Sequence, residues 1–230
     1  MNNEQTVWPQ RRAEVHAALG DVTRLRIVDL LTTSDRSSQQ LSASLGIASN
    51  LLAHHLGVLE QASLVNRHRS EGDRRRTYVC LDREALAASA GATATGQKMS
   101  ARRVVFVCTA NTARSHLAAA LWRGASAVAV TSAGTHPGER IHRGALATAR
   151  RHGLDLPDIR PRPLEGLTEG DLVVTVCDAA QEEIGDQAWA HWSVPDPAPT
   201  GTKAAFEATH DDLKSRVGGL ARSYAGASGW

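Results

Sequence analysis

The sequence contains few cysteines, and they lie far apart. Its 230 residues include only Cys80, Cys108 and Cys177. This spacing excludes a disulfide framework and does not match the closely spaced ligands of a zinc site, so no metal site is expected. Sparse cysteines in a reducing compartment are more often catalytic or redox-active than structural. The thiols are therefore the first candidates for chemistry.

The chain also lacks a long apolar run and an internal repeat. No stretch reaches the roughly 20 apolar residues that a membrane span requires. The first residues do not show a charged segment followed by an apolar one, as a secretory signal would. Hydrophobic residues make up 42% and charged residues 22% of the chain, which is a globular composition. We expect a cytoplasmic protein of one or two domains that has no membrane partner.

A stretch of small and polar residues divides the chain. Residues 88–101 are rich in Ala, Gly, Thr and Ser and show no apolar period, which is typical of a flexible linker. We expect a first domain at 1–90, a linker at 91–101 and a second domain at 102–230.

Helical periodicity dominates the first domain. The pattern predicts helices at 9–19, at 22–31, from 38 to Gly46 and from about Ser49 onward. Two strands, 64–69 and 74–81, follow around a turn at 70–73, and a last helix begins after Asp82. Short helices before a two-stranded hairpin predict a mainly-α winged helix-turn-helix.

A winged helix-turn-helix places its second helix in the DNA major groove. We expect five small or hydrogen-bonding residues of that helix to be exposed and to face DNA: Ser49, Asn50, Ala53, His54 and His55. The hairpin carries an arginine cluster suited to phosphates or a minor groove: Arg67, Arg69, Arg74, Arg75 and Arg76. The alternative is a solvated basic hairpin, since charge runs usually face water.

This first half resembles the ArsR-type repressor family. The resemblance covers about residues 10–90 and rests on segments 19–27, 52–60 and 72–78, with Val22 where proline is usual. It implies operator DNA as a partner and a homodimer formed through the N-terminal domain. Relatives that sense arsenite or metals do so with several close cysteines, whereas this domain has only Cys80. Because one cysteine cannot supply three thiolate ligands, we expect Cys80 to be a small core residue rather than part of a metalloid sensor.

The most informative segment of the chain follows the linker. An apolar run at 104–107 precedes a cysteine, five residues, an arginine and a serine, and a helical stretch comes next: Cys108, Thr109, Ala110, Asn111, Thr112, Ala113, Arg114, Ser115. Backbone N–H groups of such a loop can converge on an anion at a helix N-terminus. Arg114 adds a two-pronged donor for phosphate-like oxygens, and the same field favours the thiolate of Cys108. Ser115 can donate a hydrogen bond to that sulfur. The alternative is a buried cysteine with an accidental arginine.

Strands and helices alternate through the second domain. Strands are expected at 104–107, 127–131, 172–176 and 191–194, and helices at 115–123, 143–152, from 179 and at 203–224. This alternation predicts an α/β fold with a four-stranded parallel sheet and helices on both faces. The active site of such a fold lies where the strands end, and Cys108 and Cys177 each follow a strand directly. Asp196, between two prolines after the fourth strand, could act there as a general acid, or could belong to an ordinary turn.

Residues 103–224 resemble the low-molecular-weight tyrosine phosphatase superfamily, which includes both phosphatases and arsenate reductases. Phosphatases usually carry a second cysteine before the loop arginine, a proline after the serine and an aromatic residue after the Asp-Pro pair. This chain has Ala113, His116 and Ala198 at those places. Segments 132–135 and 191–198 look reductase-like. The resemblance to thioredoxin-coupled reductases further implies that Cys177 is a resolving cysteine.

The resemblance implies attack of Cys108 on arsenate, with the loop residues and Arg114 binding the oxyanion and Asp196 assisting departure of an oxygen. A second thiol, Cys177 or a small thiol from solution, would then release arsenite. Ile184 occupies the place of the third cysteine of thioredoxin-coupled relatives. We therefore expect no tightly bound cofactor but an external reductant: thioredoxin, or mycothiol with a glutaredoxin-like protein.

Two alternatives to an arsenate reductase fused to a regulator are kept. One is a low-molecular-weight protein tyrosine phosphatase fused to a DNA-binding domain. The other is a regulator whose second domain only senses an oxyanion.

Overall fold

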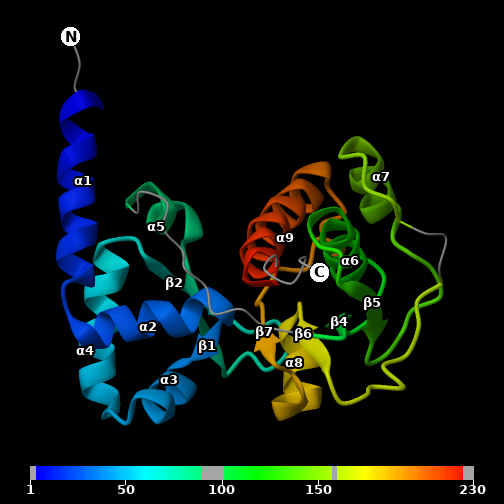
Figure 1. The fold of residues 1–230 in the computed structure, drawn as a ribbon, viewed down its shortest axis with the longest axis horizontal. Helices are drawn as coiled ribbons and strands as arrows, with labels where there is room; N and C mark the ends of the chain where they lie inside the picture. Colours follow the sequence, from blue (N-terminus) through cyan, green and yellow to red (C-terminus); the bar gives the residue numbers. More distant parts are fainter. Residues whose placement is uncertain (1–3, 90–100, 157–159, 225–230) are drawn as a thin grey trace, which may run out of the picture. The chain divides into compact units, whose positions relative to one another are not determined.

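The computed structural model of the protein describes residues 4–89, 101–156 and 160–224. The expected linker at 91–101 lies almost wholly outside them. The chain divides into two compact units. We call them the N-terminal unit (α1 to β3 and α5) and the C-terminal unit (β4 to α9), and Figure 1 labels their elements.

The N-terminal unit is mostly helical, as predicted. Its helices are α1 (Glu4–Leu19), α2 (Val22–Thr33), α3 (Ser38–Leu45), α4 (Ser49–Gln61) and α5 (Arg83–Ser89). Its strands are β1 (Arg36–Ser37), β2 (Val65–Arg69) and β3 (Thr77–Leu81). They form an antiparallel sheet in the order β1-β3-β2. The short strand β1 was not predicted, because two residues are too few to show an alternating pattern.

Local sequence fixes where these helices begin and end. Asp21 caps α2 by accepting a hydrogen bond from the backbone of Arg24 at 2.9 Å. Ser37 and Gln40 form a reciprocal capping box at the start of α3. Gly46 ends α3 with a left-handed φ of 67°, which glycine adopts without steric cost. Helix α4 then begins three residues later, at Ser49.

The C-terminal unit is an α/β fold. Its strands are β4 (Arg103–Cys108), β5 (Ala129–Gly134), β6 (Asp171–Thr175) and β7 (Ala190–His191). Its helices are α6 (Arg114–Ala125), α7 (Arg143–Arg151), α8 (Asp178–Ile184) and α9 (Lys203–Tyr224), with a short 3-10 turn η1 (Gly185–Gln187) after α8. The strands form a parallel sheet in the order β5-β4-β6-β7, as the sequence predicted. Figure 1 shows α6, α7 and α9 over one face of this sheet and α8 on the other.

Strand bounds differ by a few residues from those predicted. Strand β5 runs from 129 to 134 rather than from 127 to 131, and β7 spans only 190–191 rather than 191–194. A run of apolar residues predicts that a buried strand is present, but it does not predict at which residue the hydrogen bonds to the neighbouring strands end.

The core of the C-terminal unit lies between the sheet and the helices. Strand β4 is buried on both faces, and Phe106 packs against Trp122 of α6 and Trp192 after β7. The stripe expected on α9 is confirmed for its buried members Phe206, Leu213, Val217 and Leu220. The side chain of Tyr224, its last member, lies outside the described part. None of the described helices is long and apolar enough to cross a membrane.

Helix α7 fits against α9 only because Gly144 has no side chain. A Cβ at Gly144 would lie 2.2 Å from the ring of Phe206, whereas a Cβ at Gly124, in the last turn of α6, would meet no atom within 4 Å. The ring of His142, which caps α7, also stacks on Phe206 at a centroid distance of 5.0 Å.

The two glycines should therefore respond oppositely to alanine. We expect Gly144→Ala to lower the free energy of unfolding by about 1–3 kcal/mol, because the ring of Phe206 must move. Gly124→Ala should leave the free energy unchanged or raise it by up to about 1 kcal/mol, because alanine favours helix. Urea unfolding of both variants measures the difference. A stabilising Gly144→Ala would contradict this packing.

Candidate functional site

The loop from Cys108 to Ser115 joins the end of β4 to the start of α6. Its carbonyl oxygens are turned outward, because four of them accept backbone hydrogen bonds from the segment that leads from β5 to α7. The donors and acceptors are Thr135 to Cys108 (3.2 Å), His136 to Thr109 (2.9 Å), Gly138 to Ala110 (2.9 Å) and His142 to Thr112 (2.8 Å). In a trans peptide the N–H group points away from the C=O group of the preceding residue. The N–H groups that follow these carbonyls are therefore directed to the inside of the loop, as an anion site requires.

Two polar groups contact the sulfur of Cys108. The backbone N–H of Asn111 lies 3.2 Å from Sγ, and the hydroxyl of Ser115 lies 3.1 Å from it. The side-chain amide of Asn111 in turn donates to Ser115 Oγ at 2.8 Å, and its oxygen accepts from the backbone of Arg162 at 2.9 Å. This network suits a thiolate, which accepts hydrogen bonds at sulfur.

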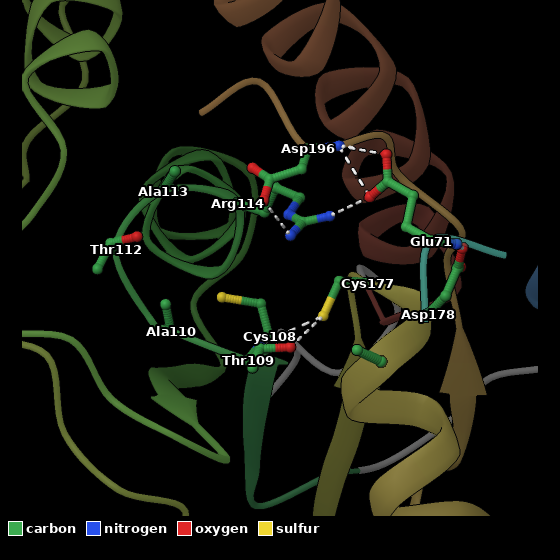
Figure 2. Close-up of a pocket in the computed structure, with 11 residues that line it drawn as sticks. Glu71, Cys108, Thr109, Ala110, Thr112, Ala113, Arg114, Cys177, Asp178 and Asp196 are labelled. Carbon is green, nitrogen blue, oxygen red and sulfur yellow. Dashed lines mark hydrogen bonds and ion pairs between the residues drawn. The ribbon is translucent and has the colours of Figure 1, made fainter. Parts of the chain in front are cut away.

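Arg114 is buried at the first position of α6 and faces the same pocket as Cys108 (Figure 2). Its Nη1 donates to the carbonyl of Val194 at 2.9 Å, and its Nη2 lies 3.1 Å from Oδ2 of Asp196. Burial acts to lower the pKa of Arg114, but electrostatic interactions with Cys177, Asp196 and Cys108 outweigh this effect and raise it above its usual value. The guanidinium therefore stays charged, and an incoming oxyanion competes with Asp196 for it.

The structure brings Cys177 to the same pocket. Strand β6 pairs with β4 in parallel register, and the backbone of Val176 donates to Val107 at 2.7 Å, so both cysteines come off the sheet at one edge. Cys177 Sγ accepts from the backbone of Thr109 at 3.2 Å and lies 3.4 Å from its hydroxyl. Burial and the nearby Cys108 raise the pKa of Cys177, so that in the resting pocket it carries its proton.

Asp178, which the sequence reasoning did not single out as a site residue, also lines this pocket. Its Oδ1 lies 3.1 Å from Nε2 of His191, and Nδ1 of His191 lies 3.0 Å from Thr175 Oγ1. Burial acts to raise the pKa of Asp178, but hydrogen bonds from His191 and Ser193 lower it below its usual value. A carboxylate right after a strand and at a helix start was the available signal. No spacing rule pointed to His191.

His116 follows the loop serine and is almost fully buried in α6. Burial lowers its pKa to about 4, although a hydrogen bond to the backbone of Asn111 opposes this effect. Its Nε2 has no hydrogen-bond partner among the described residues. The residue that stands where phosphatases usually have proline is thus a neutral histidine that touches the backbone of the anion loop.

The predicted site residues of the C-terminal unit all meet in one place. Cys108, Arg114, Asp196 and Cys177 line one pocket, together with Thr109, Ala110, Thr112 and Ala113. Asn111 and Ser115 contact the sulfur of Cys108. Figure 2 shows Asp196 and Arg114 facing each other above the two cysteines.

The predicted DNA-contact residues lie on α4 and on the hairpin β2–β3. Ser49, Asn50, Ala53 and His54 are exposed. The expectation that His55 is exposed is wrong, because its ring is buried and its Nδ1 lies 3.6 Å from the carboxylate of Asp21. Each residue of an α-helix is rotated by about 100° from the one before it, so His55 faces the core although His54 is exposed.

The arginines of the hairpin are exposed as well: Arg67, Arg69, Arg74, Arg75 and Arg76. Arg67 pairs with Glu60 of α4. Cys80 is buried in β3, as expected for a small core residue.

Each unit is similar to known proteins. Residues 103–226 match the family described as low molecular weight phosphotyrosine protein phosphatase, and residues 21–67 match the arsR family of bacterial regulatory proteins. The transcriptional repressor SdpR of Bacillus subtilis (strain 168) is 34% identical over 55 residues, which are 24% of this chain and 61% of that protein. The chain thus spans less than two thirds of the length of this relative.

Solved structures similar to the chain include an arsenate reductase from Archaeoglobus fulgidus, with 27% identity and a TM-score of 0.45 over 52% of this chain and 98% of that one. A mutant of YwlE from Bacillus subtilis shows 25% identity and a TM-score of 0.46, covering 52% of this chain and 96% of its own. An arsenate reductase in a phosphate-binding state shows 26% identity and a TM-score of 0.46, covering 54% and 98%.

The buried His116 predicts a pH dependence of stability. Its pKa is about 4 in the folded chain and about 6.5 when exposed, so the unfolded chain takes up a proton first as the pH falls. The stabilising contribution is complete above about pH 6.5 and is lost towards pH 4, by about 3 kcal/mol in total. His116→Gln should lack this part of the pH dependence. Urea unfolding at pH 7, 5.5 and 4.5 compares the two proteins, and parallel pH profiles would refute the assignment.

Proposed function

Because the chain belongs to the low molecular weight phosphotyrosine protein phosphatase family and carries an arsR-family domain before it, we propose that it joins a thiol-dependent arsenate reductase to a DNA-binding regulator. The observation that carries the reductase assignment is the presence of a second buried thiol, Cys177, in the pocket of Cys108. Hydrolysis of a phosphate ester needs one nucleophile, an anion site and an acid. Reduction of arsenate to arsenite needs two electrons, which two thiols supply.

The proposed reaction begins with the Cys108 thiolate. Its sulfur attacks As(V) of arsenate held by the loop amides and Arg114. A sulfur–arsenic bond forms, and one arsenate oxygen leaves as water after protonation. In this proposal Asp196, which lies 3.1 Å from Arg114, assists that proton transfer once its side chain releases the guanidinium.

The second step uses Cys177. Its thiol loses a proton and attacks the sulfur of Cys108, so that a disulfide forms and the sulfur–arsenic bond breaks. The electron pair of that bond leaves with arsenic, which departs as As(III) in arsenite. Thr109 must release Cys177 Sγ first, because both its backbone and its hydroxyl contact this sulfur in the resting pocket. An external thiol, from thioredoxin or from mycothiol with a glutaredoxin-like protein, would then reduce the disulfide.

A phosphatase remains the second candidate, because the same loop, Arg114 and Asp196 would serve phosphoryl transfer equally well. Against it stand Cys177, which hydrolysis would leave unused, and Ala198, where an aromatic ring would stack on a phosphotyrosine. The two functions are therefore distinguished by the products that the protein releases.

Two cysteine variants separate these functions. We expect Cys108→Ser to abolish arsenite release, because it removes the sulfur that attacks arsenate and leaves Cys177 without a partner for a disulfide. Cys177→Ser should bind arsenate but release arsenite at least about 10²-fold more slowly with thioredoxin as reductant, since the disulfide cannot form. Arsenite is measured by separation of arsenic species, and hydrolysis of an aryl phosphate is measured in parallel.

Fast aryl phosphate hydrolysis without arsenite, and unchanged by Cys177→Ser, would establish the phosphatase instead. Binding of arsenate with neither product would leave an oxyanion sensor.

For the N-terminal unit we propose DNA binding through α4 and the hairpin. The exposed Asn50 and His54 can hydrogen-bond to base edges, while Arg69 and Arg74 are placed on the hairpin for phosphates. This unit provides one buried thiol, Cys80, so its inducer is not a metalloid bound by three cysteines within it.

The hairpin arginines predict a change in salt dependence. Arg69→Ala/Arg74→Ala should weaken binding to a mixed-sequence duplex and reduce the slope of log affinity against log salt by about one for each phosphate that is no longer neutralised. Arg12→Ala, an exposed arginine of α1, is the matched control. Fluorescence anisotropy at several salt concentrations measures both. Equal slopes for the two variants would refute the hairpin's role.

A further inference from the structure

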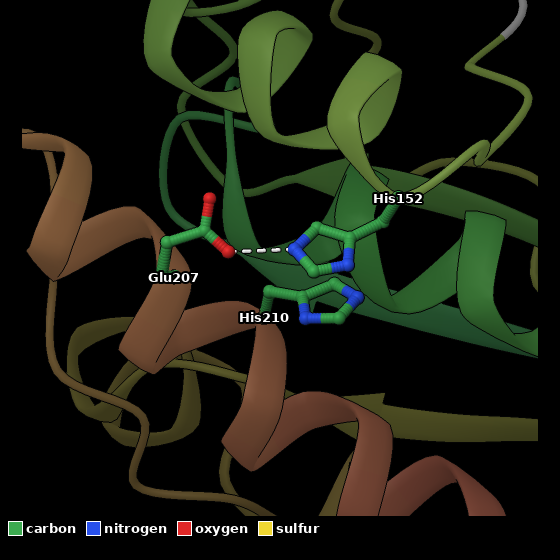
Figure 3. A group of neighbouring side chains, drawn as sticks. All are labelled: His152, Glu207 and His210. Atoms are coloured by element: carbon green, nitrogen blue, oxygen red, sulfur yellow. Dashed lines mark hydrogen bonds and ion pairs between the residues drawn. The ribbon is translucent and has the colours of Figure 1, made fainter.

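A second cluster of ligand-type side chains lies between α7 and α9, apart from the pocket residues. It consists of His152, directly after α7, and of Glu207 and His210, one helical turn apart on α9. Figure 3 shows the two imidazole rings stacked on each other and the Glu207 carboxylate directed at His152. One ligand atom of each side chain lies within 4.8 Å of the others. The sequence did not predict this cluster, because 55 residues separate His152 from Glu207.

The three side chains form a donor set that suits a transition metal. Two imidazoles and one carboxylate are a common ligand set for Zn²⁺, with a water as the fourth ligand. We propose that His152, Glu207 and His210 bind one divalent transition-metal ion, with Zn²⁺ as the best match. The assignment rests on these ligand atoms and on the neighbouring side chains that hold them.

The neighbouring Arg151 orients Glu207 but leaves one of its two carboxylate oxygens for a metal ion. Glu207 Oε1 accepts from Nε of Arg151 at 2.6 Å, and Arg151 also donates to Thr148 Oγ1 at 2.7 Å. This leaves Oε2 of Glu207, which lies 2.6 Å from Nε2 of His152. A metal ion would take the place of the hydrogen bond between Glu207 and His152.

His210 is the fixed member of the set. Its ring is almost fully buried, and its Nδ1 lies 2.8 Å from Oδ1 of the exposed Asp211. A carboxylate beside a metal-binding histidine orients the ring and raises its basicity. Asp211 also adds a negative charge, which offsets the positive charge of Arg151 next to the cation.

Binding requires one ring to turn. The rings stack with centroids 3.6 Å apart and planes 16° apart, so their nitrogen lone pairs run side by side rather than towards one point. The side chain of His152 is 31% exposed and follows the last turn of α7, whereas that of His210 is 2% exposed. His152 is therefore the ring that turns, and it gains a bond to the ion in place of the hydrogen bond to Glu207.

An ion at this position would fasten α7 to α9. The other end of α7 borders the anion loop, because the backbone of its capping residue His142 donates to Thr112 at 2.8 Å. The ion would thus stabilise the C-terminal unit. It would not itself form part of the pocket of Cys108.

The test is titration of the reduced full-length chain with ZnCl₂, followed by calorimetry and by X-ray absorption at the zinc edge. We compare wild type with His152→Asn/Glu207→Gln. The matched control is His136→Asn/Glu183→Gln, which removes an exposed histidine–glutamate pair 3.3 Å apart elsewhere in the same unit. Circular dichroism confirms that the variants are folded.

We expect one equivalent bound by wild type and control, with only N/O neighbours at about 2.0–2.1 Å and without sulfur at about 2.3 Å. The site variant should bind at least about 100-fold more weakly, since removal of an outer partner alone costs 10–100-fold. Zinc should raise the melting temperature of wild type and control but not of the site variant. The proposal is overturned by sulfur ligation of the first equivalent, by no binding to wild type, or by equal affinity in the two double variants.

Discussion

The chemistry of this chain depends on one backbone constraint, the left-handed conformation of Asn111 in the middle of the anion loop. Its φ of 50° is rare for a residue with a side chain. Both ends of the side-chain amide are used to hold it, one on Ser115 and one on the backbone of Arg162. This conformation aims the N–H of Asn111 at the sulfur of Cys108. Without it the loop would turn a carbonyl oxygen towards the sulfur, and an anion would be repelled.

The surrounding fold leaves the loop little freedom to relax. A Cβ at Gly134 would lie 2.6 Å from the carbonyl oxygen of Thr109, so the end of β5 presses directly on the loop. The outward hydrogen bonds from the segment 135–142 fix the remaining carbonyls. The anion site is therefore built before any anion arrives, and a preorganised site loses little binding free energy to ordering.

The residue pattern predicted those parts of the structure that depend on local sequence or on where strands end. Apolar run length and caps predicted the helices and the parallel sheet, and the rule that parallel strands end at one edge predicted that Cys108, Cys177 and Asp196 meet. What could not be predicted depends on rotation and on distance through space. His55 is buried because of its angle on α4, and Asp178 acquires its partner His191 from another strand. The pair of His152 and Glu207 meets only because α7 packs on α9, which no spacing between the two residues encodes.

The burial of the two pocket thiols bears on the identity of the electron donor. Cys108 is 3% exposed and Cys177 is 2% exposed, so a disulfide between them would lie at the bottom of a pocket. In thioredoxin-coupled relatives a third cysteine would carry the disulfide outward, but Ile184 stands at that place and packs against the core. For the reductase proposed above, a protein thiol would therefore reach the disulfide only if the pocket opened. A small thiol needs no such opening, because it can enter where the oxyanion enters. For the proposed reductase we therefore infer a low-molecular-weight thiol as the first reductant, with a protein partner acting on the mixed disulfide that it forms.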